Sequence, residues 1–350
     1  MVKKYIVDSV CYWADEYHMD GFRFDLVGLL DTETVNEIIR EVHKNHPNII
    51  FYGEGWTMDT FPTKDGYMMA TQNNAAYTPS FAYFNDTIRD GLKGSVFDDT
   101  EKGFVSGKPE MEKVITDCFL GADAWCGSPA QTINYVSCHD NLTLFDQLQA
   151  ARPEASRKDL IRMNNLAAAA YIMAQGTPFM QAGEEMLRTK QREDGSFDSN
   201  SYSSGDRINC LKWNDLNRAE YMQVFEYYKG LIAFRKAHSA LRLTTAEDVA
   251  AAVRPVEGLD DNVVAFHILD KRRSKIEDAL FVIFNANEAE TSVMLPNGRW
   301  NICINADKAG IQALGTVCGK VVVEPVSAMV LIGESGIPTV GDTNCAVSNL

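Results

Sequence analysis

The chain has 350 residues, of which 45% are apolar, and a formal net charge of −15. This length allows two domains with buried cores. The acidic balance, without a cluster of Lys and Arg, argues against nucleic acid or an anionic membrane surface as a partner, and no run reaches the roughly 20 apolar residues of a membrane span.

The eight cysteines are scattered, without the close pairs of a zinc or redox motif. We expect free, mostly buried thiols, which favours a reducing compartment and a cytoplasmic location. The first residues do not read as a signal peptide, because Asp8, Asp15 and Glu16 interrupt any apolar stretch.

The first predicted elements form a βαβ unit. A helix opens the chain, with its apolar face at Ile6, Val10, Trp13 and Tyr17. The segment DGFRFDL (20–26) predicts a strand, and NIIFYGE (48–54) predicts the next one. The helix between them should be capped by Asp31 or Thr32 and bury a regularly spaced set of apolar residues: Val35, Ile38, Ile39 and Val42.

Alternation of strands and helices continues to about residue 242. Strand-like runs lie near 81–85, 132–138 and 178–182, and the clearest helical patterns cover 158–175 and 218–238. This α/β pattern predicts a parallel sheet covered by helices, either doubly wound or closed as a barrel, and periodicity alone does not choose between them.

A different pattern follows. Short β-rich runs such as VVAFHIL, ALFVIFNAN and SVMLP, separated by turn residues, predict a small antiparallel sandwich. We therefore expect an α/β domain over 1–242, an all-β domain over 243–335 and a tail over 336–350.

Two acids end neighbouring predicted strands. In GFRFD the side chains alternate, so that Arg23 and Asp25 share one surface. They form either a structural ion pair or a nucleophilic carboxylate held ionised by a guanidinium. The next strand ends at Glu54, between Gly53 and Gly55, which let another chain or a ligand approach closely.

Glycoside cleavage needs such a pair of carboxyl groups. One attacks the anomeric carbon, and the other, as an acid, protonates the leaving oxygen. For a retaining pair we expect Asp25 and Glu54 to approach to about 5–5.5 Å. We also expect Arg23 to hold Asp25 ionised, while Glu54, less well paired, keeps a proton to donate. Trp56 is either a core residue or a ring on which a sugar stacks.

A third acid, Asp140, follows the predicted strand INYVSCHDN. His139 beside it is either structural or a donor to ring hydroxyls, contacts that strengthen in the transition state. The pair Glu184–Glu185 is predicted to be structural, because consecutive residues on a strand point in opposite directions. The runs Asp98–Asp99 and KQRED (190–194) are predicted to be solvated surface.

The segments DGFRFDL, YGEGW and VSCHDN resemble three signature regions of the α-amylase superfamily, glycoside hydrolase family 13. The segments NDTIRDGLKGSVFD, GFVSG, AGEEMLRTK and NSYSSGDRIN resemble the type I pullulanases within it, and the resemblance runs from residue 4 to about residue 332. It implies a (β/α)8 barrel, of which five strands are expected here, about strands four to eight.

The resemblance also implies roles for residues of this chain. Asp25 would be the nucleophile, Glu54 the general acid/base and Asp140 the transition-state stabiliser. Arg23 would orient Asp25, and His139 would bind the sugar in the cleaved position. Trp56 would stack on a sugar on the leaving-group side, and Asp206 would contact the sugar on the non-reducing side.

The expected function is debranching of an α-glucan polysaccharide or oligosaccharide at α-1,6 links, with retention. The alternatives are an isoamylase, a glucan-branching transferase or a non-catalytic amylase-like interaction subunit. Because the family's first signature region is not found, we expect a fragment that begins before barrel strand four and has little activity alone. No cofactor or metal is expected in it, although a full-length protein could hold calcium.

Overall fold

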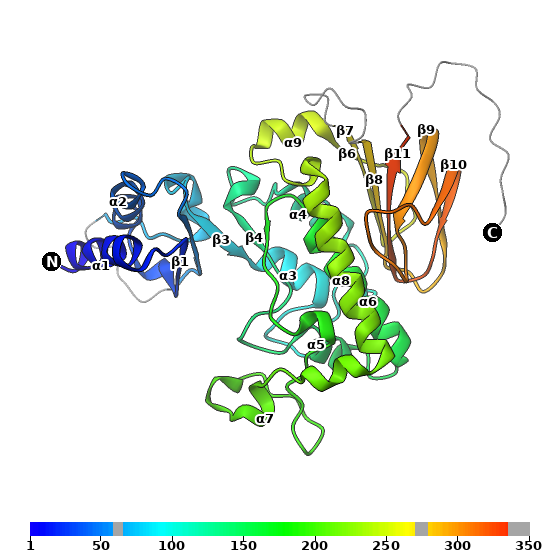
Figure 1. Cartoon of the computed structure of the whole chain (residues 1–350), viewed down its shortest axis with the longest axis horizontal. Coiled ribbons are helices and arrows are strands. Elements are labelled where there is room, and N and C mark those ends of the chain that lie inside the picture. Colours follow the sequence, from blue (N-terminus) through cyan, green and yellow to red (C-terminus); the bar gives the residue numbers. More distant parts are fainter. Residues whose placement is uncertain (59–65, 270–278, 335–350) are drawn as a thin grey trace. The chain divides into compact units, whose positions relative to one another are not determined.

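The computed structural model describes residues 1–58, 66–269 and 279–334. Figure 1 shows the order of its elements. The chain divides into two compact units. The first contains Met1–Asn85, Gly121–Ile133 and Thr244–Ala246, and the second contains the rest of the described chain. The predicted tail lies outside the described residues.

Five short strands form a hydrogen-bonded sheet in the order β1-β2-β3-β4-β5. Strands β1 and β2 pair in parallel, and so do β2 and β3. This confirms the predicted α/β class. The bounds are β1 Gly21–Phe24, β2 Ile50–Gly53, β3 Ala82–Asn85, β4 Thr132–Asn134 and β5 Thr177–Pro178.

Strands β4 and β5 are shorter than predicted. Residues 132–137 are all buried, so the apolar run correctly predicts burial of this segment. A strand also needs ladder hydrogen bonds, however, and those end at Asn134, whose carbonyl accepts from the Phe179 amide. The backbone from Ser137 onward is thereby free to form the turn that carries His139 and Asp140.

Helix α2 (Thr32–His43) begins where the sequence predicts. The Asp31 side chain accepts a 2.8 Å hydrogen bond from the Thr34 amide, which satisfies one of the donors left open at a helix start. The four predicted apolar residues of this helix are buried, which confirms its core face.

Helix α1 (Val2–Tyr17) buries a face that overlaps the predicted one only in part, at Val10 and Ile6. Its buried residues are Val7, Val10 and Ala14, whereas Trp13 is 41% exposed and Tyr17 is 53% exposed. Small side chains let α1 pack closely on α2, and the two large rings stay outside, 4.4 Å apart between centroids.

The helices of the second unit include two that were predicted, α6 and α8. The second half of α6 is buried on all sides, from Leu166 to Met173. The bounds of the helices in this part are α3 Asp86–Lys93, α4 Glu112–Leu120, α5 Leu144–Ala151, α6 Arg157–Met173, α7 Asp206–Asn209, α8 Ala219–Ala237 and α9 Ala246–Ala252.

The predicted antiparallel all-β part is confirmed. Its strands join in the order β10-β9-β11-β8-β7-β6. Both faces of β8 are apolar: Val282 belongs to the cluster that includes α6, and Ile283 belongs to a second cluster on the other face. The bounds are β6 Val253–Pro255, β7 Val263–Leu269, β8 Ala279–Asn285, β9 Thr291–Ile304, β10 Gly315–Val323 and β11 Ser327–Gly333.

The cysteines differ in part from the expectation. Cys118 and Cys303 are buried thiols, but four other thiols are half-buried or exposed, and Cys318 is disulfide-bonded. Within the described part of the chain, no helix combines the length and the apolar character needed to cross a membrane.

Candidate active site

One guanidinium joins two of the predicted acids at the end of β1. Arg23 donates from Nη1 to Asp25 Oδ1 at 2.7 Å and from Nη2 to Glu54 Oε1 at 2.6 Å. Because both carboxylates are bound by one side chain, they lie side by side, which is compatible with the about 5–5.5 Å of a retaining pair.

The sequence produces this arrangement through strand register and side-chain size. Arg23 lies opposite Tyr52 in the parallel pairing, so Glu54 follows directly beside the end of β1. Phe22 and Phe24 pack on the hydrophobic cluster of the first unit, as alternation predicts, which leaves Arg23 and Asp25 on the other surface.

Gly53 permits the close approach of the two strands. A Cβ at Gly53 would lie less than 3.0 Å from the Phe24 carbonyl oxygen, closer than real Cβ atoms come. We expect Gly53→Ala to lower the free energy of unfolding by about 2 kcal/mol, because backbone would have to move. Gly310→Ala, where a Cβ meets nothing within 4 Å, is the control. Equal thermal midpoints for the two variants would contradict the role of Gly53.

Glu54 has more hydrogen-bond partners than Asp25, whereas the sequence predicted fewer. Glu54 is only 8% exposed and accepts from Arg23 and, at 3.1 Å, from the Leu26 amide. The Asp25 side chain is 71% exposed and accepts from Arg23. The prediction that Glu54 is the less well paired acid is therefore wrong. The Glu54 amide also donates to the Phe24 carbonyl, which keeps residue 54 beside the end of β1.

Trp56 lies two residues beyond Glu54 and is half-buried. It belongs to the first unit, together with Arg23, Asp25 and Glu54. Both of its predicted roles, in the core or beside a sugar, stay predictions.

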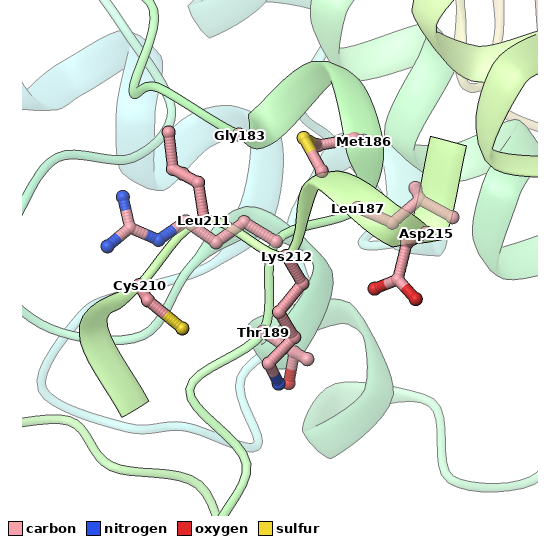
Figure 2. Close-up of a pocket in the computed structure, with 9 residues that line it drawn as sticks. Gly183, Met186, Leu187, Thr189, Cys210, Leu211, Lys212 and Asp215 are labelled. Carbon is pink, nitrogen blue, oxygen red and sulfur yellow. The ribbon is translucent and has the colours of Figure 1, made fainter. Parts of the chain in front are cut away.

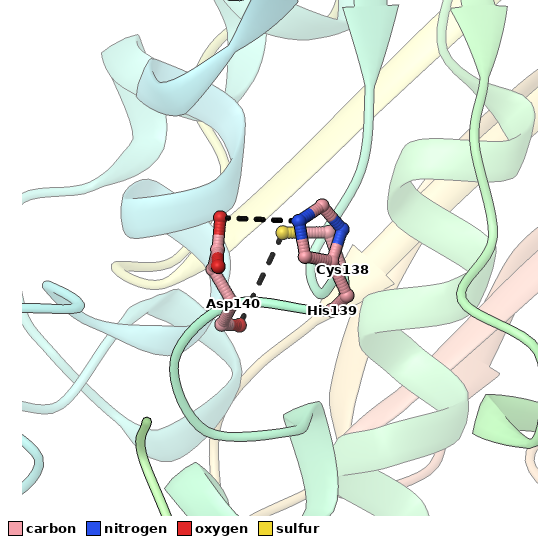
Figure 3. Close-up of side chains that lie close together, drawn as sticks. All are labelled: Cys138, His139 and Asp140. Atoms are coloured by element: carbon pink, nitrogen blue, oxygen red, sulfur yellow. Dashed lines mark hydrogen bonds and ion pairs between the residues drawn. The ribbon is translucent and has the colours of Figure 1, made fainter. Parts of the chain in front are cut away.

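The third acid lies in the second unit, on the turn Ser137–Leu142 that follows β4. Figure 3 shows the exposed side chains of His139 and Asp140, which form a 3.5 Å contact between Nε2 and Oδ2. The Cys138 thiol points to the Asp140 carbonyl. Asn141 has a φ of 58°, in the left-handed region that Asn tolerates better than most residues.

Cys138, His139 and Asp140 also bring three ligand-type atoms within 4.8 Å of one another. This set does not fit calcium, which takes six to eight oxygen ligands. Burial raises the pKa of the Cys138 thiol, so the thiolate that softer metals bind is disfavoured. The residues here thus give no support to a calcium site at Asp140.

Asp206 is the first residue of α7 and is exposed. Its carbonyl accepts from the Cys210 amide at 2.7 Å, and it belongs to the second unit with His139 and Asp140. Its predicted contact with sugar stays a prediction.

Glu184 is structural, as predicted, but it lies on a short 3-10 helix rather than a strand. It is 3% exposed and accepts from three hydroxyl groups, those of Ser137, Tyr171 and Tyr228. Burial raises the pKa of Glu184 from 4.5 to about 7. The carboxyl group therefore braces the start of the Ser137–Leu142 turn from inside the second unit.

This buried carboxyl predicts a pH dependence of stability. Between pH 4.5 and about 7 the folded chain holds a proton on Glu184 that the unfolded chain has lost, so this group's stabilisation falls as the pH rises through that window. The loss amounts to roughly 3 kcal/mol. Glu184→Gln cannot lose a proton, and its thermal midpoint should fall several degrees less between pH 5 and pH 7.5. Parallel midpoint curves would contradict this.

The burial of Lys190 and its contacts with the turn were not predicted from the sequence. The run 190–194 was predicted to be solvated, yet Lys190 is 1% exposed and donates to the His139 and Asn141 carbonyls. A run of mixed charges is typical of solvated surface, so the run itself did not indicate that one of its lysines is buried. The only hint was that Lys190 is also the last residue of the segment AGEEMLRTK.

The cavity in Figure 2 lies in the second unit, beside the segment Gly183–Thr189 that precedes Lys190. Its volume is about 20 Å³, whereas ligand pockets span roughly 300–1,000 Å³. It has room for about one water molecule and none for a sugar.

Comparison with known proteins identifies the family of this chain. The family described as "Alpha amylase, catalytic domain" matches residues 1–244, and "Pullulanase, all-beta domain" matches residues 253–308. The pullulanase of Bacillus subtilis is 35% identical over 304 residues, which cover 85% of this chain and 41% of that protein.

Solved structures agree. The pullulanase from Bacillus acidopullulyticus superposes with a TM-score of 0.87 at 37% identity, covering 94% of this chain and 40% of that one. The pullulanase from Anoxybacillus sp. LM18-11, complexed with maltotetraose, superposes with a TM-score of 0.85 at 34% identity, covering 95% and 46%. The chain spans less than half the length of each of these relatives. It belongs to the α-amylase family of glycoside hydrolases and joins the catalytic-domain segment of that family to an all-β domain of the pullulanase type.

Proposed function

We propose that this chain supplies the catalytic carboxyl groups of a retaining hydrolase that debranches α-glucans at α-1,6 links. The observation that carries the proposal is the pair Asp25 and Glu54, held on one guanidinium at the ends of adjacent parallel strands. Parallel-barrel enzymes place their reacting groups at this edge of the sheet.

The reaction proceeds in two displacements. An Asp25 oxygen attacks the anomeric carbon while Glu54 gives its proton to the departing glycosidic oxygen, which leaves a glycosyl ester on Asp25. Glu54 then takes a proton from water, whose oxygen attacks the same carbon and releases Asp25. Glu54 accepts from Arg23 at Oε1 and from the Leu26 amide at Oε2, and each oxygen keeps a second lone pair that can carry the proton.

An α-glucan is the proposed substrate class. Solved pullulanases similar to this chain are complexed with maltotriose and maltotetraose. The chain itself is strongly acidic, and a neutral polymer does not have to overcome that charge. Pullulan, glycogen and limit dextrins are the proposed polymers, with Asp140 and His139 contributing contacts to the sugar that is cleaved.

The test uses a chimera in which this chain replaces the segment of the Bacillus subtilis pullulanase that aligns with it. The chimera should release maltotriose from pullulan and leave amylose intact. A folded chimera that acts only on amylose would indicate a different linkage, and one that lengthens or rebranches chains would indicate a transferase. The unmodified relative serves as the positive control.

Arg23 should matter for turnover rather than for binding. In the chimera we expect Arg23→Ala to lower kcat by about 10²-fold or more while KM changes less than about threefold, because the guanidinium orients both reacting groups. Arg23→Lys should recover little, since an ammonium lacks the planar fork that reaches two carboxylates. An unchanged kcat with a raised KM would make Arg23 a substrate contact.

A further inference from the structure

Three buried groups hold the Ser137–Leu142 turn that carries Asp140. The Ser137 hydroxyl donates to Glu184 at 2.7 Å, and Lys93 donates to the Leu142 carbonyl at 3.2 Å. Lys190 donates to the carbonyls of His139 at 2.7 Å and Asn141 at 2.8 Å. Of these contacts, only the pair made by Lys190 brackets Asp140 itself.

The geometry of this pair determines where Asp140 stands. The two carbonyls that flank Asp140 both converge on Nζ, which the left-handed backbone of Asn141 allows. With its neighbours' carbonyls turned inward, Asp140 keeps its side chain on the solvent side, 54% exposed. If the ammonium were removed, two carbonyls would lose a charged donor, and the turn could relax.

Lys190 is itself fixed in place. The Asp146 carboxylate accepts from the Lys190 amide at 2.7 Å and from the Thr189 hydroxyl at 2.5 Å. Asp146 is fully buried in the first turn of α5, where its amide bonds to the Thr143 hydroxyl at the N-cap. The helix that follows the turn thus anchors the lysine that holds the turn.

Burying the Lys190 ammonium costs desolvation free energy, which a residue that only fills space would not incur. Its side chain is 1% exposed, and burial lowers the pKa of its ammonium. A buried cation needs compensating partners, and here these are the two carbonyls and the nearby Asp146 carboxylate. An apolar side chain would fill the same space without that cost, so the contacts point to a role in the turn.

We infer that Lys190 is a positioning residue that fixes Asp140 by binding the carbonyls on either side of it. The inference rests on the proposed function, in which Asp140 stabilises the transition state. Lys190 touches no substrate and acts through the turn. A displacement of about 1 Å in a catalytic group can cost on the order of 10²-fold in rate, so a loosened turn should be visible in kcat.

Kinetics of the chimera provide the first test. Lys190→Met should lower kcat by about 10²-fold with KM within about threefold, and Lys190→Arg, which keeps a cation, should recover at least tenfold of that loss. The matched control is Lys93→Met. Lys93 is also 1% exposed and also binds this turn, but it donates to the Leu142 carbonyl rather than to the two carbonyls that flank Asp140. It should lower kcat less than fivefold. Equal losses in the two Met variants would overturn the inference.

A double-mutant cycle separates positioning from general stability. If Lys190 acts through Asp140, then Lys190→Met in an Asp140→Asn background should lower kcat less than about threefold further. A full additional 10²-fold loss would show that Lys190 acts elsewhere, and would overturn the inference.

Hydrogen exchange on the chimera gives a readout that needs no activity. In Lys190→Met, peptides covering 137–143 should exchange at least tenfold faster than in the chimera without this substitution, while the α6 peptide keeps its rate. Lys190→Gln provides a second variant if the Met variant does not fold. Unchanged exchange at 137–143 would overturn the inference. Activity of the unmodified chimera tests the proposed function separately, so the two can fail independently.

Discussion

Replacing Asp25 by Asn in the chimera should lower kcat on pullulan by about 10⁴-fold or more, because the amide cannot form the glycosyl ester. The protein should still fold, since the Asp25 side chain is 71% exposed and Arg23 keeps its contact with Glu54. Asp8→Asn is the matched control: this exposed aspartate pairs with Lys4 on the surface of α1, and its loss should change kcat less than twofold.

Retention of more than a tenth of the turnover in Asp25→Asn would remove Asp25 as the nucleophile. If the unmodified chimera binds maltotetraose but hydrolyses nothing, the non-catalytic interaction subunit becomes the better interpretation. The measurement in both cases is reducing-end release from pullulan under saturating substrate.

The 350-residue chain alone should hydrolyse little or no pullulan. Strands β1 and β5 each pair on one side in the described sheet, which leaves open edges that a closed barrel would not have. Aromatic side chains on α1 are exposed as well, Tyr12 at 53% and Trp13 at 41%. We therefore expect association through edges and apolar surface, and a site around Asp25 that is open to water.

Light scattering and reducing-end release from the same preparation check this expectation. The chimera serves as the comparison, because it contains the same residues within a longer chain. A soluble monomer of the 350-residue chain with a turnover of about 1–10³ per second, the usual enzyme range, would show that these five strands complete a working site by themselves.

The strands that carry the first two acids could be predicted because their signals are local. The alternation in GFRFD fixed which surface Arg23 and Asp25 share, and Asp31 marked the start of α2 through its own hydrogen bond to Thr34. Gly53 predicted a close approach, which the short distance from its position to Phe24 bears out.

Features that depend on tertiary contacts could not be predicted. The exposed Trp13 lies on a helix with two apolar faces, and only packing against α2 decides which face is buried. Glu54 is bound by the Leu26 amide and by Arg23, contacts made across two strands. Lys190 sits in a mixed-charge run that is typical of surface, and its acceptors lie about fifty residues earlier in the chain.

The stereochemistry of the first product tests the retaining pair most directly, because retention requires Asp25 and Glu54 to act in two displacements. Proton NMR of the chimera during pullulan hydrolysis should show the α anomer at the new reducing end before mutarotation. A slow fluoroglycoside substrate should leave a glycosyl group on the peptide that contains Asp25, detected by mass spectrometry. A β anomer as the first product, or a label on another carboxylate, would contradict the assignment of Asp25 as the nucleophile of a retaining enzyme.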